Sequence, residues 1–524
     1  MSSFRSKVSS CFKMHGFTLR SDATKYIVEV LTPFNEVQQV ENLDRIIEAI
    51  QKQQLSSTMI DKSICEIAIE ECNAEQDEES DKIFSVIDAF EIPRFLYNPD
   101  RKKFIKEKML GVQVPGLYGD AKAKTSLFKE RYAVLLQRTS RHDLFTPPIP
   151  GTHASEQSKK FKLQPIEYLL GSSAKLGEII SLGMLTQMKE GKWFLEDPTG
   201  AVQLDLKQAN FHSGLFTENC FVLAEGWYED EIFHVTAFGF PPPEPAKTTR
   251  AYFGNINFFG GQSATSVKAS VKLQNIEKEN EDAMIVFLSD VWLDDLKVLE
   301  KLRVLFTGYS EVPPVCFVFT GNFTSKPAGS SNHAKLLKDC FKTFTKLILE
   351  FPSIIESSKF VFVPGPQDPG PSLIAPRPPI PCCITQEMTD KFPNVFFASN
   401  PCRIQYCTQE IVVYREDIVT KMCRNCVKFP KDADIPMHFA KTIICQGHLS
   451  PLPLHVAPIY WSFDNAMRVY PLPDLIVCAD KFDPFKVTQS DCSVINPGSF
   501  ARSDYSFQVY IPASRQVEES RISD

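Results

Sequence analysis

The chain has 524 residues, too many for one hydrophobic core, and this length predicts roughly two to four domains. Its 43% hydrophobic and 23% charged residues are ordinary for a globular protein, and no apolar run approaches the roughly 18 residues of a membrane span. The formal net charge of −7 argues against an autonomous nucleic-acid binder, which would carry a basic face. Fifteen cysteines without a regular framework, and no secretory leader, indicate reduced thiols in the cytosol or nucleus.

Residues 1–75 are predicted to form a small helical domain, with Ser56 and Ser57 as candidate caps of its last helix. The first 20 residues lack acids and weakly resemble a transit peptide, but they run directly into the helical pattern. A domain of this size has a modest core, so we expect its outer faces to serve docking. Three apolar stripes define its helices: Tyr26, Ile27, Val30 and Leu31; Leu43, Ile46, Ile47 and Ile50; Ile60, Ile64, Ile67 and Ala68.

Residues 76–158 are predicted to form an acidic linker followed by an extended connector. The run EECNAEQDEESD at 70–81 is typical of a solvated linker. Beyond it, prolines at 93, 99, 115, 147, 148 and 150 interrupt short apolar pieces. We therefore expect an extended segment that packs on the body of the protein.

Residues 159–245 are predicted to form a small β-barrel of the OB type, because five short strand candidates alternate with turns. Asp197-Pro198-Thr199-Gly200 has suitable chemistry for the turn between the second and third strand. The five candidates are IISLGMLTQM (179–188), KWFLED (192–197), AVQLDL (201–206), CFVLAEGWY (220–228) and IFHVTAFGF (232–240).

Binding of single-stranded DNA by this barrel is an alternative that its charge disfavours. Trp193 and Phe194 could stack bases, as aromatic residues of OB barrels often do. However, residues 178–240 carry three basic side chains against ten acidic ones, an excess of seven negative charges. Phosphate binding requires the opposite sign, so a structural or protein-binding barrel is favoured.

Residues 246–524 are predicted to form a layered α/β domain with a largely buried sheet, because short apolar strands alternate with helices. An apolar face over 337–348 predicts one of these helices. The strand candidates are MIVFL (284–288), VCFVF (315–319), FVFV (360–363), VFFA (395–398), IVVY (411–414) and LIVC (475–478).

The turns that follow these strands resemble the motifs of the calcineurin-like metallophosphoesterase family. That family builds a binuclear metal site from Asp, Asn and His ligands, and the resemblance implies its α/β sandwich fold. The matching turns are LSDVWL (288–293), FTGNFTS (319–325), VPGPQD (363–368), GHL (447–449), CADKF (478–482) and INPGS (495–499).

Most ligands that the resemblance implies are replaced in this chain. Asp290 is retained, but Trp292 stands at a His position, and an indole cannot ligate a metal through its N–H. Asn322 replaces the bridging Asp, which removes the charge that holds two cations together. Pro366 and Gln367 replace the Asn ligand and the His acid, and Asp480 and Phe482 replace the last pair of His ligands. Asp368, which ends the VPGPQD turn, and His448, at the position of a lone His, are the other site positions.

We therefore expect an inactive phosphoesterase fold without catalytic residues, metal or cofactor. The enzyme alternative is a divergent phosphoesterase that holds one metal ion with Asp290, Asn322, Asp368 and His448. A zinc site is a further alternative, since Cys423 and Cys426 form a CxxC and Cys402 and Cys407 lie upstream. The spacing of that second pair is poor for a zinc knuckle, so buried free thiols are favoured.

A helical domain, an OB barrel and a degenerate phosphoesterase domain, in this order, resemble the B subunits of eukaryotic replicative DNA polymerases. With the helical domain in front, the chain fits the epsilon branch of that family. The strings that carry the resemblance are RTSRHDLFTPP (138–148), FLEDPTG (194–200), GNINFFGG (254–261), NPCRIQYCTQE (400–410) and PLPDLIVCADKFDPF (471–485).

The resemblance implies a nuclear, non-catalytic scaffold subunit. Its barrel and phosphoesterase domains would bind the cysteine-rich C-terminal domain of the polymerase catalytic subunit. Its N-terminal domain, similar to the helical lid of AAA+ ATPases, would face the replicative helicase and the GINS complex. Small histone-fold subunits would belong to the same complex, contact with DNA would be indirect, and no membrane is involved.

Overall fold

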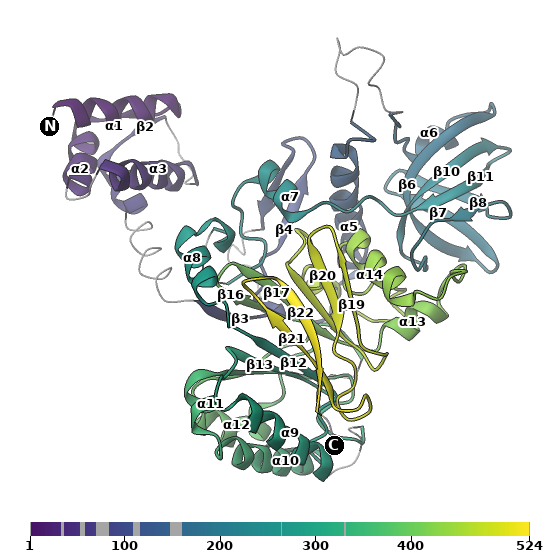
Figure 1. Ribbon diagram of the computed structural model, residues 1–524. Coiled ribbons are helices and arrows are strands. Elements are labelled where there is room, and N and C mark those ends of the chain that lie inside the picture. Colours follow the sequence, from purple (N-terminus) through teal and green to yellow (C-terminus); the bar gives the residue numbers. More distant parts are fainter. Residues whose placement is uncertain are drawn as a thin grey trace. The chain divides into compact units, whose positions relative to one another are not determined.

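The computed structural model divides the chain into two compact units, Met1–Ile83 and Phe84–Asp524 (Figure 1). Each unit has its own core and is described by itself. Among the described residues, no helix is long and apolar enough to cross a membrane. The structure describes residues 2–32, 36–52, 58–69, 83–107, 116–146, 160–261, 263, 265–327, 329, 332–371 and 373–522.

In the first unit, helices surround a small apolar core beside a short parallel pairing of two strands. Val8 and Phe12 of the first helix are buried in this core, and sequence analysis assigned no helix there. The elements are α1 (Ser2–Met14), β1 (Thr18–Leu19), α2 (Ser21–Leu31), α3 (Glu36–Lys52), β2 (Met59–Ile60) and a helical stretch over 62–69.

The predicted apolar stripes of this unit are confirmed except for the third. The stripe on α3 is fully buried, whereas Ile60 lies on β2 and not on a helix. Ile67 is 51% exposed, so its place in the buried stripe is wrong. The helical face that packs inward has Cys65, Ala68 and Ile69, which follow the i, i+3, i+4 rule. Ser56 and Ser57 lie outside the described residues.

The second unit contains the predicted barrel. Its strands follow the order β10-β6-β7-β8-β11-β9, and an additional β10–β11 pairing closes the sheet on itself. Leu185, Leu195, Val222 and Phe233 fill its interior. The elements are α6 (Ile166–Leu170), β6 (Leu176–Lys189), β7 (Lys192–Asp197), β8 (Gly200–Asp205), β9 (Asn210–Phe211), β10 (Phe221–Glu229) and β11 (Ile232–Gly239), which confirms all five predicted strands.

The rest of the second unit is a sandwich of two six-stranded sheets, with orders β15-β14-β13-β12-β21-β22 and β19-β20-β18-β17-β16-β3. All six predicted strands lie in these sheets, and most of their residues are buried on both faces. The strands are β3 (Phe84–Asp88), β12 (Ile285–Ser289), β13 (Cys316–Thr320), β14 (Lys359–Val363), β15 (Val395–Phe397), β16 (Cys402–Tyr406), β17 (Gln409–Arg415), β18 (Leu475–Ala479), β19 (Phe485–Gln489), β20 (Cys492–Asn496), β21 (Ser506–Ile511) and β22 (Gln516–Arg521).

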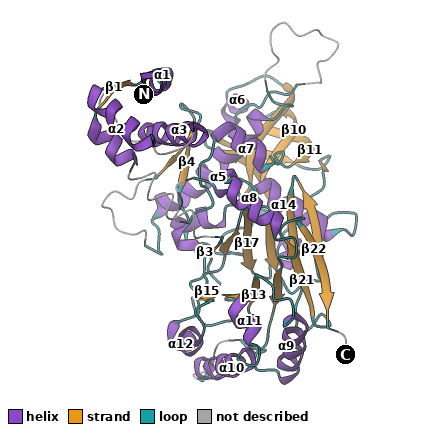
Figure 2. Cartoon of the chain, turned by 60° about the vertical axis from the view of Figure 1, so that its left-hand side comes forward, coloured by secondary structure: helices purple, strands orange, loops and turns teal. Residues whose placement is uncertain are grey.

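Helices cover the outer faces of this sandwich. The layer of α9, α10 and α12 packs on the first sheet (Figures 1 and 2), while α13 and α14 pack on the second. The bounds are α7 (Ala246–Phe253), α8 (Val271–Glu279), α9 (Leu296–Tyr309), α10 (His333–Ile348), α11 (Pro352–Ser357), α12 (Cys382–Lys391), α13 (Val419–Arg424) and α14 (Ile435–Gln446), with short 3-10 turns η1 (Ala89–Glu91), η3 (Val267–Ala269) and η4 (Trp461–Met467).

The prediction of an extended connector over 76–158 is wrong for its described part. It supplies the edge strand β3, a hairpin of β4 (Phe95–Asn98) with β5 (Lys103–Lys106), and the long helix α5 (Ala121–Arg141), capped by Asp120. The buried face of α5 includes two arginines beside Leu127 and Leu135, which hides its apolar pattern. Its packing on the body of the second unit is confirmed.

Candidate functional site

Four of the predicted site positions lie just after strands of the sandwich, at the same edge where a fifth strand ends in Arg415. Asp290, Asn322 and Asp368 follow β12, β13 and β14 of the first sheet, while Arg415 ends β17 and Asp480 follows β18 of the second. The three strands of the first sheet are mutually parallel, and so are β17 and β18. Parallel strands bring their carboxyl ends to one edge, which is where α/β folds place their sites.

Arg415 lies at the centre of this edge and was not among the predicted site residues. Its side chain is fully buried. One Nη donates to Asp290 Oδ1 at 2.8 Å, and the other donates to Asp417 Oδ1 at 2.8 Å and to the carbonyl of Ala479 at 3.3 Å. Its Nε donates to the carbonyl of Gly321. Burial disfavours the charged guanidinium, but the two carboxylates outweigh this effect and raise the pKa of Arg415.

Asp290 and Asn322 are brought together, and their polar atoms are occupied by other groups of the chain. Asp290 Oδ1 accepts from the backbone N–H and the side-chain amide of Asn322, at 3.0 and 3.1 Å, as well as from Arg415. Asn322 Oδ1 accepts from the backbone N–H of Gln367 at 2.9 Å. Gln367 therefore contributes to the site through its backbone N–H, a contact that the sequence gives no way to predict.

Asp368 anchors the turn after β14 to the turn after β13. Its carboxylate accepts from the backbone N–H groups of Phe323 at 2.9 Å and Gly365 at 2.7 Å. Burial raises the pKa of Asp368 to about 6, against the lowering effect of these two donors. Gly321 is required here because a Cβ on it would lie 1.9 Å from Asp368 Oδ2.

The neighbouring turn contains Pro366, which contributes only its carbonyl, an acceptor for Arg377 Nη1 at 3.1 Å. The second Nη of Arg377 donates to the carbonyl of Asp368 at 2.8 Å. Asp480 accepts from the backbone N–H groups of Val419 and Phe482, at 2.9 and 2.8 Å. Burial raises the pKa of Asp480 as well.

Two predicted positions point their side chains into apolar surroundings. Trp292 packs against the core between the first sheet and its helices, with the guanidinium of Arg502 4.9 Å from its ring centroid. Phe482 packs on the outer core of the second sheet near Phe485. Neither ring adds a polar group to the centre around Arg415.

His448 makes its hydrogen bonds elsewhere. Its Nδ1 accepts from the backbone N–H of Ser450 at 3.0 Å, and its Nε2 lies 3.3 Å from Asp464 Oδ1, which also pairs with Arg131 of α5. Burial, followed by the charge of Arg131, lowers the pKa of His448 to about 4. The neutral ring with its proton on Nε2 satisfies both contacts.

The residues present do not fit the two-metal group that the phosphoesterase resemblance implies. A metal clamp needs free carboxylate and imidazole ligands, whereas here the carboxylates accept from Arg415 and from backbone N–H groups. Within the described ranges, no group of three or more His, Cys, Asp and Glu could hold a metal ion.

The four cysteines of the zinc alternative are not brought together. Cys402 and Cys407 belong to the core between the two sheets. Cys423 and Cys426 pack on the outer face of the second sheet. Burial raises the pKa of Cys426 to about 12, which favours the thiol over the thiolate that zinc requires.

Helices α5 and α14 fix the barrel to the sandwich, and sequence analysis missed this junction. Arg138 of α5 donates to the carbonyls of Cys445, in α14, and Pro241, just after the barrel. Gln446 of α14 forms two hydrogen bonds of 2.8 Å with the backbone of Phe221 in β10. The run RTSR at 138–141 was the only signal, because a buried arginine cannot be told from a solvated one by sequence.

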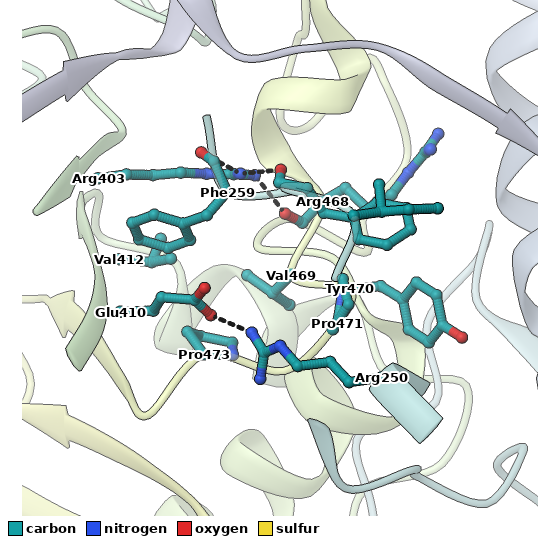
Figure 3. A pocket seen from close by; sticks show the side chains of 12 residues that line it. Arg250, Phe259, Arg403, Glu410, Val412, Arg468, Val469, Tyr470, Pro471 and Pro473 are labelled. Carbon is teal, nitrogen blue, oxygen red and sulfur yellow. Dashed lines mark hydrogen bonds and ion pairs between the residues drawn. The ribbon is translucent and has the colours of Figure 1, made fainter. Parts of the chain in front are cut away.

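Arg141 continues this junction with an ion pair to Glu244 at 2.7 Å and a hydrogen bond to the Tyr470 hydroxyl at 3.1 Å. Nearby lies a cavity of about 10 Å³, which holds one water molecule at most (Figure 3). Figure 3 shows Arg250 paired with Glu410 across it, at 2.7 Å. This cavity is lined by residues that follow the barrel in the chain, and it has no room for a small-molecule substrate.

Comparisons with known proteins match all three parts of the chain. The family described as the B subunit of DNA polymerases alpha and epsilon matches residues 285–487, which contain most of the sandwich. The DNA polymerase epsilon subunit 2-like OB-fold domain matches residues 121–242, a range that contains α5 as well as the barrel. The family described as DNA polymerases epsilon N terminal matches residues 1–72.

Relatives extend the match over the whole chain. DNA polymerase epsilon subunit 2 of Bos taurus is 57% identical over 99% of this chain and 98% of its own length. The Drosophila melanogaster protein of the same name is 45% identical over the same shares. The DNA polymerase epsilon B subunit of Saccharomyces cerevisiae is 30% identical over 84% of this chain and 75% of its own length. A solved archaeal phosphodiesterase aligns with 46% of this chain and 99% of its own length, with 11% identity and a TM-score of 0.27.

Fold and site together define a class of protein in which an OB barrel is fixed to an α/β sandwich whose strand-end centre is occupied by an arginine. The full-length relatives then decide the family within this class. The chain belongs to the DNA polymerase epsilon subunit 2 family.

Proposed function

We propose that the chain is a non-catalytic accessory subunit of the DNA polymerase epsilon complex, acting as a scaffold in chromosomal replication in the nucleus. The observation that supports a non-catalytic role is the centre around Arg415, where the chain's own groups occupy Asp290 and Asn322. Phosphoester hydrolysis with two metal ions needs these side chains free for the ions. The family relationship supports the place in a polymerase complex.

The barrel and the sandwich form the binding surface for the C-terminal, cysteine-rich domain of the catalytic subunit. Two features of the structure support this assignment. Arg138 and Gln446 tie the two domains into one body, which suits a partner that contacts both. The excess of acidic residues over 178–240 suits a protein partner better than a nucleic acid, so that contact with DNA is indirect.

The first unit, which has a core of its own, binds the replicative helicase and the GINS complex. The proposal includes a lid-like fold of the AAA+ ATPase type for this unit, and its helices with a short strand pair support that assignment. A separately folded module lets the chain hold a second partner while its body stays on the polymerase. The small histone-fold subunits join the same complex.

The test is purification of the tagged full chain from nuclear extract, followed by identification of what is recovered. We expect a large polymerase catalytic chain that stays bound at moderately high salt. As a matched variant, a chain without residues 1–69 should retain the catalytic chain and lose the helicase components. Recovery of the full chain alone would contradict the proposal. So would hydrolysis of a model phosphodiester in the presence of Mn²⁺ that Asp290→Asn abolishes.

A further inference from the structure

The groups that surround the Arg415 guanidinium are all oxygen acceptors. Two are carboxylates, of Asp290 and Asp417, and two are backbone carbonyls, of Gly321 and Ala479. Carboxylate and carbonyl oxygens are the ligands that Mg²⁺, Ca²⁺ and Mn²⁺ prefer in proteins. The guanidinium therefore lies in surroundings whose chemistry also suits a hard divalent cation.

These acceptors come from both sheets of the sandwich. Asp290 and Gly321 follow β12 and β13 of the first sheet, whereas Asp417 and Ala479 belong to the ends of β17 and β18 in the second. Four of the five N–H donors of Arg415 have a partner among them. One side chain thus connects two sheets at the edge where their parallel strands end.

The charges at this edge require a cation. The carboxylates of Asp290 and Asp417 are 4% and 18% exposed, and Asp368 and Asp480 are buried beside them. Buried carboxylates are costly unless they are paired. Among the other cations near this edge, Arg377 donates to carbonyls and not to a carboxylate. Lys481, which is 49% exposed, lies 3.5 Å from the second oxygen of Asp417, so Arg415 is the buried cation that both carboxylates share.

We propose that this centre is a cation site whose resident cation is the Arg415 guanidinium, which joins the two sheets and excludes a divalent metal ion. The proposal goes beyond the role of the chain in a polymerase complex, because it rests on the contacts of Arg415 alone. An arginine is charged at every physiological pH and cannot dissociate from the chain. The sheets are therefore held together independently of the supply of metal ions.

The test is Arg415→Ala in the full chain, titrated with Mn²⁺ while the signal of free Mn²⁺ is followed by electron paramagnetic resonance. We expect the variant to bind one Mn²⁺ per chain where the wild type binds none at this centre. We also expect Mn²⁺ to raise the Tm of the variant by several degrees and to leave that of the wild type unchanged. Adding Asp290→Asn to the variant should abolish both effects.

Arg403→Ala is the matched control. Arg403 is also a buried arginine of the second sheet, but its guanidinium donates only to the carbonyls of Phe258, Phe259 and Arg468. Its removal leaves no carboxylate without a partner, so Mn²⁺ should neither bind to this variant nor raise its Tm. Equal Mn²⁺ binding by the two variants, or a folded Arg415→Ala chain that binds no Mn²⁺, would overturn the proposal.

If Arg415→Ala alone does not fold, its combination with Asp290→Asn and Asp417→Asn decides the question. The triple variant removes the two carboxylates together with their cation, so the proposal expects folding to return. A triple variant that stays as unfolded as the single one would show that Arg415 acts by filling space, and the proposal would be wrong. The result is independent of whether the chain assembles with a polymerase, so the two proposals can fail separately.

Discussion

Asp464 is the residue whose change most directly tests the junction between α5 and the sandwich. Its side chain in η4 is 4% exposed and receives Nε and Nη2 of Arg131, the Nε contacts being 3.2 Å long. It also lies against Nε2 of His448. Burial by itself raises the pKa of Asp464, but the charge of Arg131 more than reverses this, so the carboxylate stays ionised.

Asp464→Asn keeps the shape of this side chain and removes its charge. Arg131, whose side chain is 6% exposed, is then left as a buried cation without a counter-ion. Breaking a buried pair from one side costs about 3–5 kcal/mol in the free energy of unfolding. The exposed pair of Arg303 with Glu350 is the matched control, since its side chains are 55% and 48% exposed and Glu350→Gln should cost less than about 1 kcal/mol.

Urea unfolding of the full chain, followed by tryptophan fluorescence, measures both variants. The signal reports the second unit alone, because every tryptophan of the chain lies there: Trp193, Trp227, Trp292 and Trp461. A change below about 1 kcal/mol for Asp464→Asn would refute the reasoning, because it would mean that Arg131 finds water or another partner. We also expect limited proteolysis to release the barrel from this variant sooner than from the control.

Two further predictions concern pH and packing. The pKa of His448 is about 4 in the folded chain and about 6.5 in the unfolded chain. Because the unfolded chain therefore binds this proton more readily, the free energy of unfolding should fall by up to about 3 kcal/mol as the pH drops through this window. Urea unfolding across this window should show a flatter profile for His448→Gln, and an unchanged slope would contradict a buried neutral ring held by Ser450. Gly226→Ala would place a Cβ 2.0 Å from the carbonyl oxygen of His234, which we expect to destabilise the barrel by at least about 3 kcal/mol. Gly191→Ala is the control, because nothing lies within 4 Å of the added Cβ, and it should cost only about 1 kcal/mol in the same urea assay. Equal losses for the two variants would show that backbone strain, and not the clash with His234, destabilises the barrel.

The sandwich strands that sequence analysis found are those made almost entirely of apolar residues. β12, β13 and β18 are continuous apolar runs, which a short window of sequence detects directly. β19 was missed because only one of its faces is buried, and β3 because its five residues sit within a stretch interrupted by prolines. The strands β16, β20 and β21 are as buried as these and were also missed, because polar residues such as Arg403, Ser493 and Gln508 interrupt their apolar runs. Detection in the sandwich therefore followed apolar composition and not burial.

The site was predicted less well because its contacts are long-range. Arg415 pairs with Asp290 across 125 positions of sequence, and a search for metal ligands does not consider a cation. His448 was assigned to the site by its position after a glycine. That Gly447 has φ of 60° and ends α14, so the Gly-His pair marks the end of a helix, which is the ordinary use of a glycine there.

The pairing of β3 with β16 has a mechanical consequence. The first unit ends at Ile83, and β3, which begins at the next residue, is bound to the second sheet by a five-residue ladder. The backbone of Ala89 donates to the Ser399 hydroxyl at 2.7 Å, and the backbone of Ser399 donates to Asp88 at 2.7 Å, directly after that ladder. A pull on the first unit therefore loads an edge strand of the sandwich before it reaches α5 or the barrel.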